Sequence, residues 1–255
     1  MKGVSLQGAY VLHRRPYRET SFLVDVFTPD DGRFTVVAKG VRKARSNLQG
    51  LLQSFTPLTI SWQGNGELVT LTHTEMRGEL KRLHGDCLFA GFYLNELLMI
   101  LLQKWDPHPA LFQWYEKTLT LLQADVLEEK YLRSFEKRLL EELGYGLLPK
   151  MAVNAPAMIL TDHYYRYVPE DGLVTVGACV NESLQHPHLF AGHLLLNIAN
   201  ENWQDSETLS AAKRLMRLIL TPMLGNRSLH SRKLFARSGM GSSPDKRQIG
   251  KLLAN

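Results

Sequence analysis

The chain has 255 residues, a net charge of +5, 44% hydrophobic residues and 22% charged residues, values that exclude wholesale disorder and a fibrous protein. The charge is unevenly spread: residues 1–80 carry +3, residues 81–200 carry −4 and residues 201–255 carry +6. Its two cysteines, Cys87 and Cys179, are too few and too far apart for a disulfide framework or a thiolate zinc site. Because neither a secretory signal nor a bilayer-spanning apolar segment is visible, we expect a cytoplasmic protein with no membrane partner.

Residues 1–80 alternate short apolar runs with turn residues, which is typical of β-structure. In Ser21–Thr28 the side chains of Phe22, Val24 and Val26 fall on one face of a predicted strand. The predicted strands are Ala9–His13, Ser21–Thr28, Arg33–Ala38, Leu58–Trp62 and Glu67–Thr74. Five strands with one long connection between the third and fourth predict a five-stranded barrel of the OB type, with an SH3-like barrel as the competing fold.

The long connection, residues 38–50, is strongly basic. It carries Lys39, Arg42, Lys43 and Arg45 and no acidic residue. Such a cluster favours a polyanionic partner, and nucleic acid is the commonest one. A solvated surface loop is the alternative interpretation.

From residue 81 the apolar period changes to that of helices, so an α+β protein is predicted, with a barrel domain at 1–80 and a helical domain at 81–237. Helices are expected at 83–103, 110–123, 127–143, 189–198 and 209–221, the last with Ser206 as its N-cap and Pro222 as its end. Its Lys213, Arg214 and Arg217 form a predicted basic stripe. Residues 150–180 read as an irregular insertion with some strand, in which the tyrosines at 164, 165 and 167 are expected to pack rather than to stack on bases. Residues 238–255 are expected to be a disordered tail.

No motif for catalysis is present. Gly172 and Gly177 have the outer spacing of a phosphate loop but lack its Lys and Ser/Thr, and a metal site at His186, His188 and His193 is disfavoured because Pro187 stiffens that loop. We therefore predict no catalytic residue, no metal and no cofactor, and expect a binding protein rather than an enzyme.

A set of segments spans about residues 8–237: Ala9–Ser21, Val26–Thr28, Gly32–Arg33, Val37–Gly40, Leu51–Leu58, Tyr93–Leu98, Leu132–Glu136, Leu143–Gly146, Ala211–Arg214 and Ser231–Phe235. These segments resemble the RecO family of bacterial DNA repair proteins. The resemblance implies an N-terminal OB domain, a helical C-terminal domain and a mediator role in the RecF pathway. It also implies binding of single- and double-stranded DNA, annealing of complementary strands, and, with RecR, the loading of RecA onto DNA covered by single-stranded DNA-binding protein (SSB).

Many members of the family carry two Cys-x-x-Cys pairs after the Gly-Tyr-Gly motif, as a zinc ribbon would. Here Met151 and Asn154 stand at the first pair and only Cys179 remains near the second. A zinc-ribbon-like insertion without its zinc ligands is therefore expected.

For the DNA path we predict phosphate contacts from two loops of one barrel rim. The residues are Arg14, Arg15 and Arg18 with Tyr17 as a stacking ring, then Lys39, Arg42, Lys43 and Arg45, continued by Lys213, Arg214 and Arg217. By resemblance, Arg133 is a candidate for binding the acidic tail of SSB; its alternative is an ion pair with Glu129 or Glu136. An OB-fold RNA-binding protein remains the alternative function, and a nuclease is disfavoured because no carboxylate cluster suggests one.

Overall fold

The computed structural model describes residues 6–43, 46–145, 159–169, 171–178 and 186–237. These residues form two compact units. The first contains the barrel, the chain up to Phe112, residues Leu119–Leu127 and the C-terminal part from Ser228; the second contains Gln113–Thr118 and Glu128–Arg227. Helical segments that precede and follow the second unit in sequence therefore belong to the same unit as the barrel.

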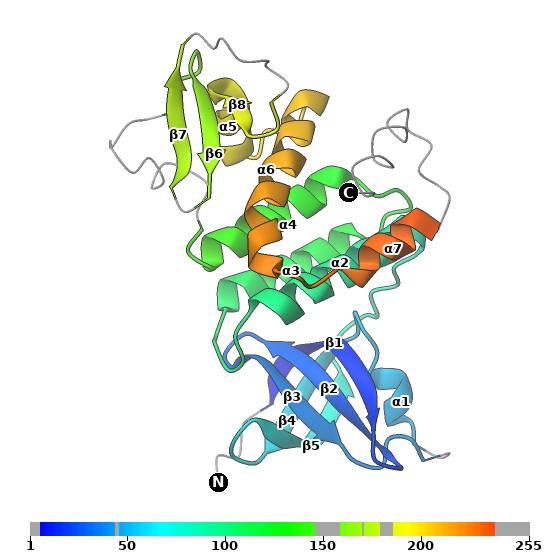
Figure 1. Ribbon diagram of the computed structural model, residues 1–255. Coiled ribbons are helices and arrows are strands. Elements are labelled where there is room, and N and C mark those ends of the chain that lie inside the picture. Colours follow the sequence, from blue (N-terminus) through cyan, green and yellow to red (C-terminus); the bar gives the residue numbers. More distant parts are fainter. Residues whose placement is uncertain (1–5, 44–45, 146–158, 170, 179–185, 238–255) are drawn as a thin grey trace. The chain divides into compact units, whose positions relative to one another are not determined.

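Five strands close into a barrel in the order β1-β2-β3-β5-β4 (Figure 1). They are β1 (Gln7–Tyr17), β2 (Ser21–Thr28), β3 (Gly32–Ala38), β4 (Pro57–Gln63) and β5 (Leu68–Met76). Neighbouring strands are antiparallel except β3 and β5, which run parallel. The arrangement confirms the OB-type barrel followed by a helical domain.

The barrel core follows from the alternation seen in the sequence. Phe22, Val24 and Val26 of β2 point inward among the apolar residues of the other strands, and burial of each such side chain contributes roughly 1.5–3 kcal/mol. On the opposite face Phe27 packs against Phe112, with ring centroids 5.4 Å apart. Both faces of β2 are therefore buried near its C-terminal end.

The β2–β3 turn requires glycine at position 32. Gly32 has φ of +64°, and a Cβ there would lie 1.8 Å from the carbonyl oxygen of Asp106. The following residue, Arg33, donates to the Leu102 carbonyl at 2.9 Å. This end of the hairpin is thus held closely by the helical chain that follows the barrel.

Besides the short helix α1 (Leu48–Leu51), three described helices belong wholly or partly to the first unit: α2 (Gly85–Leu101), α3 (Pro109–Leu121) and α7 (His230–Arg237). The carboxylate of Glu96 on α2 accepts hydrogen bonds from the backbone N–H groups of His230 and Ser231, at 2.8 and 2.9 Å, and from the Ser231 hydroxyl. Phe89 and Phe235 pack edge to face beside this contact. The C-terminal helix is therefore tied to α2 by its first turn (Figure 1).

In the described residues, the second unit combines Gln113–Thr118 of α3 and three whole helices with a small sheet of order β7-β6-β8. Its elements are α4 (Glu129–Glu142), β6 (Tyr164–Val168), β7 (Gly172–Gly177), β8 (Leu189–Ala191), α5 (Gly192–Ala199) and α6 (Ser206–Leu224). Tyr165 and Tyr167 are buried, which confirms that they pack in a core. Residues 189–191 pair with β6 instead of starting a helix.

Two details of α6 correct the sequence prediction. Its N-cap is Asp205, not Ser206, because the Asp205 carboxylate accepts the Thr208 N–H at 2.5 Å. Pro222 lies inside the last turn. The helix ends at Leu224, and the C-cap residue Gly225 adopts φ of +57°.

Met151, Asn154 and Cys179 lie outside the described residues, as does the predicted tail 238–255. Within the described ranges, no three His, Cys, Asp or Glu side chains are grouped so that they could hold a metal ion. No helix of this part of the chain is long and apolar enough to cross a membrane.

Candidate nucleic-acid interface

Two loops meet on one rim of the barrel. The turn Arg18–Thr20 joins β1 to β2, and β3 ends beside the start of β2, since Phe22 pairs with Ala38. Arg42 connects the turn to the loop after β3: its backbone N–H donates to the Thr20 carbonyl at 2.9 Å and its guanidinium donates to the Arg18 carbonyl at 3.1 Å. The predicted placement of both loops on one rim is thus seen directly.

The first loop is shorter than expected. The sequence predicts Arg14 and Arg15 in this loop, but β1 continues to Tyr17, so both arginines lie on the strand. The register explains the difference, because Arg14, Arg15 and Tyr17 all pair with β2 residues.

We define the rim cluster as Arg15, Arg18, Lys39, Arg42 and Lys43. All five side chains are exposed. Within the described chain, Arg18, Lys39, Arg42 and Lys43 form no ion pair with a carboxylate, so their charges are available to a ligand. Arg45, the remaining predicted cation of the loop, lies outside the described residues.

Arg15 is held by a buried acid. The Asp25 carboxylate accepts from Arg15 Nη1 at 3.2 Å and from the Thr35 hydroxyl at 2.6 Å, and lies 3.7 Å from His13 Nδ1. Only 3% of the Asp25 side chain is exposed, against 51% for Arg15. The acid therefore fixes the arginine on the barrel surface while leaving half of it open to solvent.

Tyr17 and Arg18 form a stacked pair at the turn. The Arg18 Cζ lies 5.2 Å from the centre of the Tyr17 ring, which is a cation–π distance. Arg18 itself has a left-handed backbone, with φ of +51°. The ring that the sequence offers for base stacking is thus partly covered by the neighbouring arginine.

Arg14 uses its guanidinium within the protein. Its Nη1 donates to the carbonyls of Gln49 and Leu52, at 2.8 and 3.0 Å, and its Cζ lies 5.2 Å from the centre of the Phe22 ring. This cation therefore binds backbone acceptors of α1 (Leu48–Leu51) and its C-cap, and its side chain is only partly exposed.

The predicted basic stripe on α6 does not present three free cations. Lys213 and Arg217 are exposed, and Lys213 pairs with Glu129 at 3.1 Å. Arg214 is turned inward, where it donates to the Leu189 carbonyl at 2.9 Å and covers the Phe190 ring. Burial lowers the pKa of Arg214.

Arg133, the candidate for the SSB tail, is buried in the second unit. Its Nη1 lies 2.9 Å from the Glu136 carboxylate, and the two side chains are 9% and 1% exposed. The sequence offered Glu129 or Glu136 as an ion-pair partner of Arg133. In the structure the partner is Glu136, and the pair is buried rather than on the helix surface.

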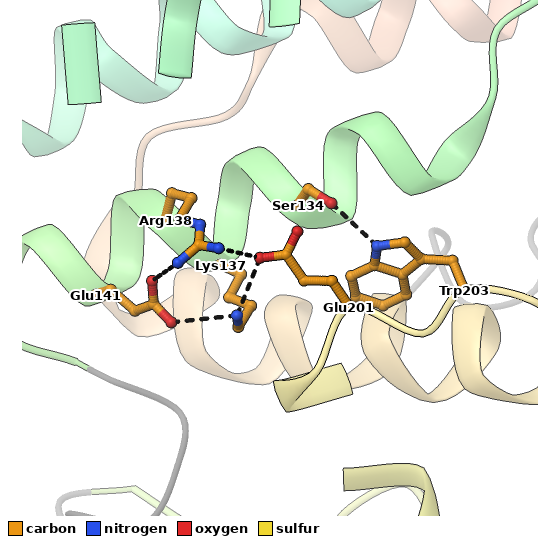
Figure 2. A network of polar contacts seen from close by, with 6 residues as sticks. All are labelled: Ser134, Lys137, Arg138, Glu141, Glu201 and Trp203. Atoms are coloured by element: carbon orange, nitrogen blue, oxygen red, sulfur yellow. Dashed lines mark hydrogen bonds and ion pairs between the residues drawn. The ribbon is translucent and has the colours of Figure 1, made fainter. Parts of the chain in front are cut away.

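A polar network on α4 was not predicted from the sequence (Figure 2). Lys137 and Arg138 each contact both Glu141 and Glu201, with distances from 2.5 to 3.4 Å, and Arg138 Cζ also lies 4.6 Å from the centre of the Trp114 ring. The spacing of Lys137 and Glu141 is visible in the sequence, but nothing local marks Glu201 as their partner.

A closed five-stranded barrel with exposed cations on one rim is typical of the OB-fold proteins that bind nucleic acids. Residues 1–79 match the family model described as "Recombination protein O N terminal", and residues 82–233 match "Recombination protein O C terminal". The chain therefore belongs to the RecO family of DNA repair proteins.

Similar relatives, each named DNA repair protein RecO, come from several bacteria. The protein from Dechloromonas aromatica is 43% identical over 91% of this chain and 95% of its own length. The protein from Pseudomonas aeruginosa PAO1 is 46% identical over 92% of this chain and 96% of its own length. The protein from Nitrosococcus oceani is 45% identical over 91% and 92%, respectively.

Proposed function

We propose that this chain is a non-enzymatic mediator of recombinational repair in the RecF pathway. It binds single- and double-stranded DNA through the rim cluster, anneals complementary strands, and acts with RecR to load RecA on SSB-coated DNA, in the cytoplasm and at the nucleoid. The observation that carries the proposal is the pair of loops joined through Arg42, which gathers cations without carboxylate partners on one edge of the barrel.

The rim cluster supports binding that is dominated by phosphates. Lysine and arginine side chains that neutralise phosphates release counterions, so the logarithm of the binding constant falls linearly with the logarithm of the salt concentration. For about six phosphates on a single strand the slope is near −4. Tyr17 adds a ring on which one base stacks once the Arg18 guanidinium moves to a phosphate.

The test is fluorescence anisotropy of a labelled single-stranded oligonucleotide against salt, for the native protein and for the double variant Lys39→Gln/Lys43→Gln. We expect weaker binding and a slope shallower by about 1.4, the value for two lost phosphate contacts. The matched control is Arg82→Gln/Lys104→Gln, which removes the same charge at exposed positions outside both rim loops. Equal effects of the two variants, or a native slope near zero, contradict the rim as the DNA surface.

The alternative function, an OB-fold RNA-binding protein, is supported by the same basic rim. It is distinguished by repeating the titration with an RNA of the same sequence, because recognition of the 2′-hydroxyl favours RNA. Equal or tighter binding of DNA supports the repair function. Annealing of complementary strands is measured without ATP, once with Mg²⁺ and once with a chelator. Strand cleavage that occurs only with Mg²⁺ would contradict the non-enzymatic proposal.

Binding of the SSB tail at Arg133 requires that the arginine exchange Glu136 for the carboxylate of the peptide. A labelled peptide with the SSB tail sequence, titrated with native protein and with Arg133→Gln, tests this. Unchanged affinity in a variant that retains its circular dichroism spectrum places the tail elsewhere.

A further inference from the structure

The basic loop is anchored at both ends, and the two anchors differ in kind. At its start the loop is joined to the β1–β2 turn by the two hydrogen bonds of Arg42. At its end the loop enters α1, which has four residues and is too short to be a stable helix alone. Something outside the helix must therefore hold its position.

α1 has little stabilisation of its own. Of the described residues, Asn47 stands at the N-cap but makes no side-chain capping hydrogen bond, and the helix has no acidic residue in its first turn and no basic residue in its last. Leu52 is buried in the barrel core and Leu48 and Leu51 pack against it. The carbonyl groups at the C-terminal end of the helix need hydrogen-bond donors from outside it.

Arg14 supplies those donors from β1. Its Nη1 binds the Gln49 and Leu52 carbonyls together, and its guanidinium covers the Phe22 ring. A cation at the C-terminal end of a helix also offsets the partial negative charge of the carbonyls. Arg14 thus supplies, from 35 and 38 residues away in sequence, donors for two carbonyls at the C-terminal end of α1, in addition to the backbone bond from Leu52 N–H to the Leu48 carbonyl.

We infer that Arg14 is a positioning residue that fixes the C-terminal end of the basic loop, and not one of the phosphate ligands. The inference rests on the proposed function of the rim cluster and refines it. Arg14 sets the loop in place before DNA arrives, so that less ordering is required when DNA binds. The neighbouring cations Lys39, Arg42 and Lys43 make the contacts.

The experiment compares substitutions that keep or remove the charge. Arg14→Lys keeps the charge, but its side chain is one bond shorter and lacks the planar fork; Arg14→Gln removes the charge. Lys43→Arg and Lys43→Gln are the matched pair at an exposed rim position. The native protein and all four variants are titrated with a labelled single-stranded oligonucleotide across a salt series. The native protein and the two Arg14 variants are also digested briefly with trypsin, for which Arg42, Lys43 and Arg45 are sites.

If Arg14 positions the loop, both Arg14 variants bind DNA roughly three- to tenfold more weakly with the native salt slope, and both are cut faster by trypsin at 42–45. Lys43→Gln then binds more weakly with a slope shallower by about 0.7, whereas Lys43→Arg keeps the native slope because its charge is retained. The trypsin digestion does not involve DNA. If the native protein shows no salt-dependent DNA binding, the proposed function fails, but the digestion still tests whether Arg14 anchors the loop.

Two results overturn the inference. Native behaviour of Arg14→Lys in both assays, with a slope shallower by about 0.7 in Arg14→Gln, makes Arg14 a phosphate ligand. Faster cleavage of Arg14→Lys with native affinity shows that anchoring the loop does not matter for DNA binding. Thermal unfolding of each variant separates a local change in the loop from loss of the barrel.

Discussion

The side-chain amide of Asn95 donates a hydrogen bond of 2.9 Å to the carbonyl of Leu12. Leu12 is the extra residue of β1, since Val11 pairs with Val26 and His13 with Asp25. A β-bulge leaves its extra residue out of the ladder. Asn95, on α2, therefore satisfies a carbonyl at the point where β1 bends, and Glu96 beside it satisfies the first turn of α7.

Asn95→Ala removes a buried donor from a buried acceptor. We expect a loss of about 1–3 kcal/mol in the free energy of unfolding, the cost of leaving a buried polar group without its partner. The measurement is urea unfolding followed by circular dichroism. Gln113→Ala, at an exposed amide on α3, is the control, and equal midpoints for the two variants would show that the bulge does not depend on Asn95.

The network of Figure 2 predicts coupling between Arg138 and Glu201. In a double-mutant cycle with Arg138→Gln and Glu201→Gln, we expect a coupling energy of about 1–2 kcal/mol. This is less than for a fully buried pair, because the two side chains are 32% and 21% exposed and solvent screens them. The readout is the unfolding free energy of the four proteins, and strictly additive effects would contradict the prediction.

The cap of α6 gives a prediction for pH. Hydrogen bonds from the backbone and hydroxyl of Thr208 hold the pKa of the Asp205 carboxyl below its usual value. Because the pKa is lower in the folded state, the charged cap stabilises the fold above the unfolded pKa of about 3.9, and this contribution disappears as the pH falls through the folded pKa.

We therefore expect the native protein to have a higher melting temperature than Asp205→Asn at pH 7, and the difference between the two melting temperatures to shrink as the pH is lowered toward 2.5. Thermal melts across this range check it. Asp205→Ala, which removes the cap itself, serves as the reference and melts lowest at pH 7. A difference between native and Asp205→Asn that does not change with pH would contradict the role of the charge.

Arg18 combines a left-handed backbone with an exposed charge, and the two can be separated. Arg18→Ala and Arg18→Gly both remove the cation, so both should weaken DNA binding to the same extent. Glycine tolerates φ of +51° without the steric cost that alanine retains, about 1–2 kcal/mol, although its greater freedom in the unfolded chain offsets part of this. We expect Arg18→Gly to be about 0.5–1 kcal/mol more stable than Arg18→Ala in urea unfolding. A more stable alanine variant would contradict the argument from the backbone.

The elements that sequence reasoning predicted well depend on local patterns. The alternation in Ser21–Thr28 and the turn ending at Gly32 are sufficient for a hairpin, and the strand count is sufficient for the OB barrel. The exposed lysines of the basic loop were also predictable, because a short run of like charges is seldom buried.

What the sequence did not reveal depends on contacts between distant residues. Arg14 and Arg18 look alike in sequence, but only Arg14 meets the carbonyls of α1. Arg214 turns inward because Leu189 offers it an acceptor, and Glu201 lies 64 residues from Lys137 in sequence. Residues 189–191 form a strand because β6 offers an edge with which they pair.

The hydrogen bonds from α7 to Glu96 also set the order in which the chain completes its first unit during synthesis. Ser231 is made 135 residues after Glu96, which at about 5–20 residues per second takes on the order of ten seconds. During that interval the surface of α2 that later receives α7 has no partner from this helix. An N-terminal fragment that ends before Ser228 keeps this surface of α2 without α7 permanently.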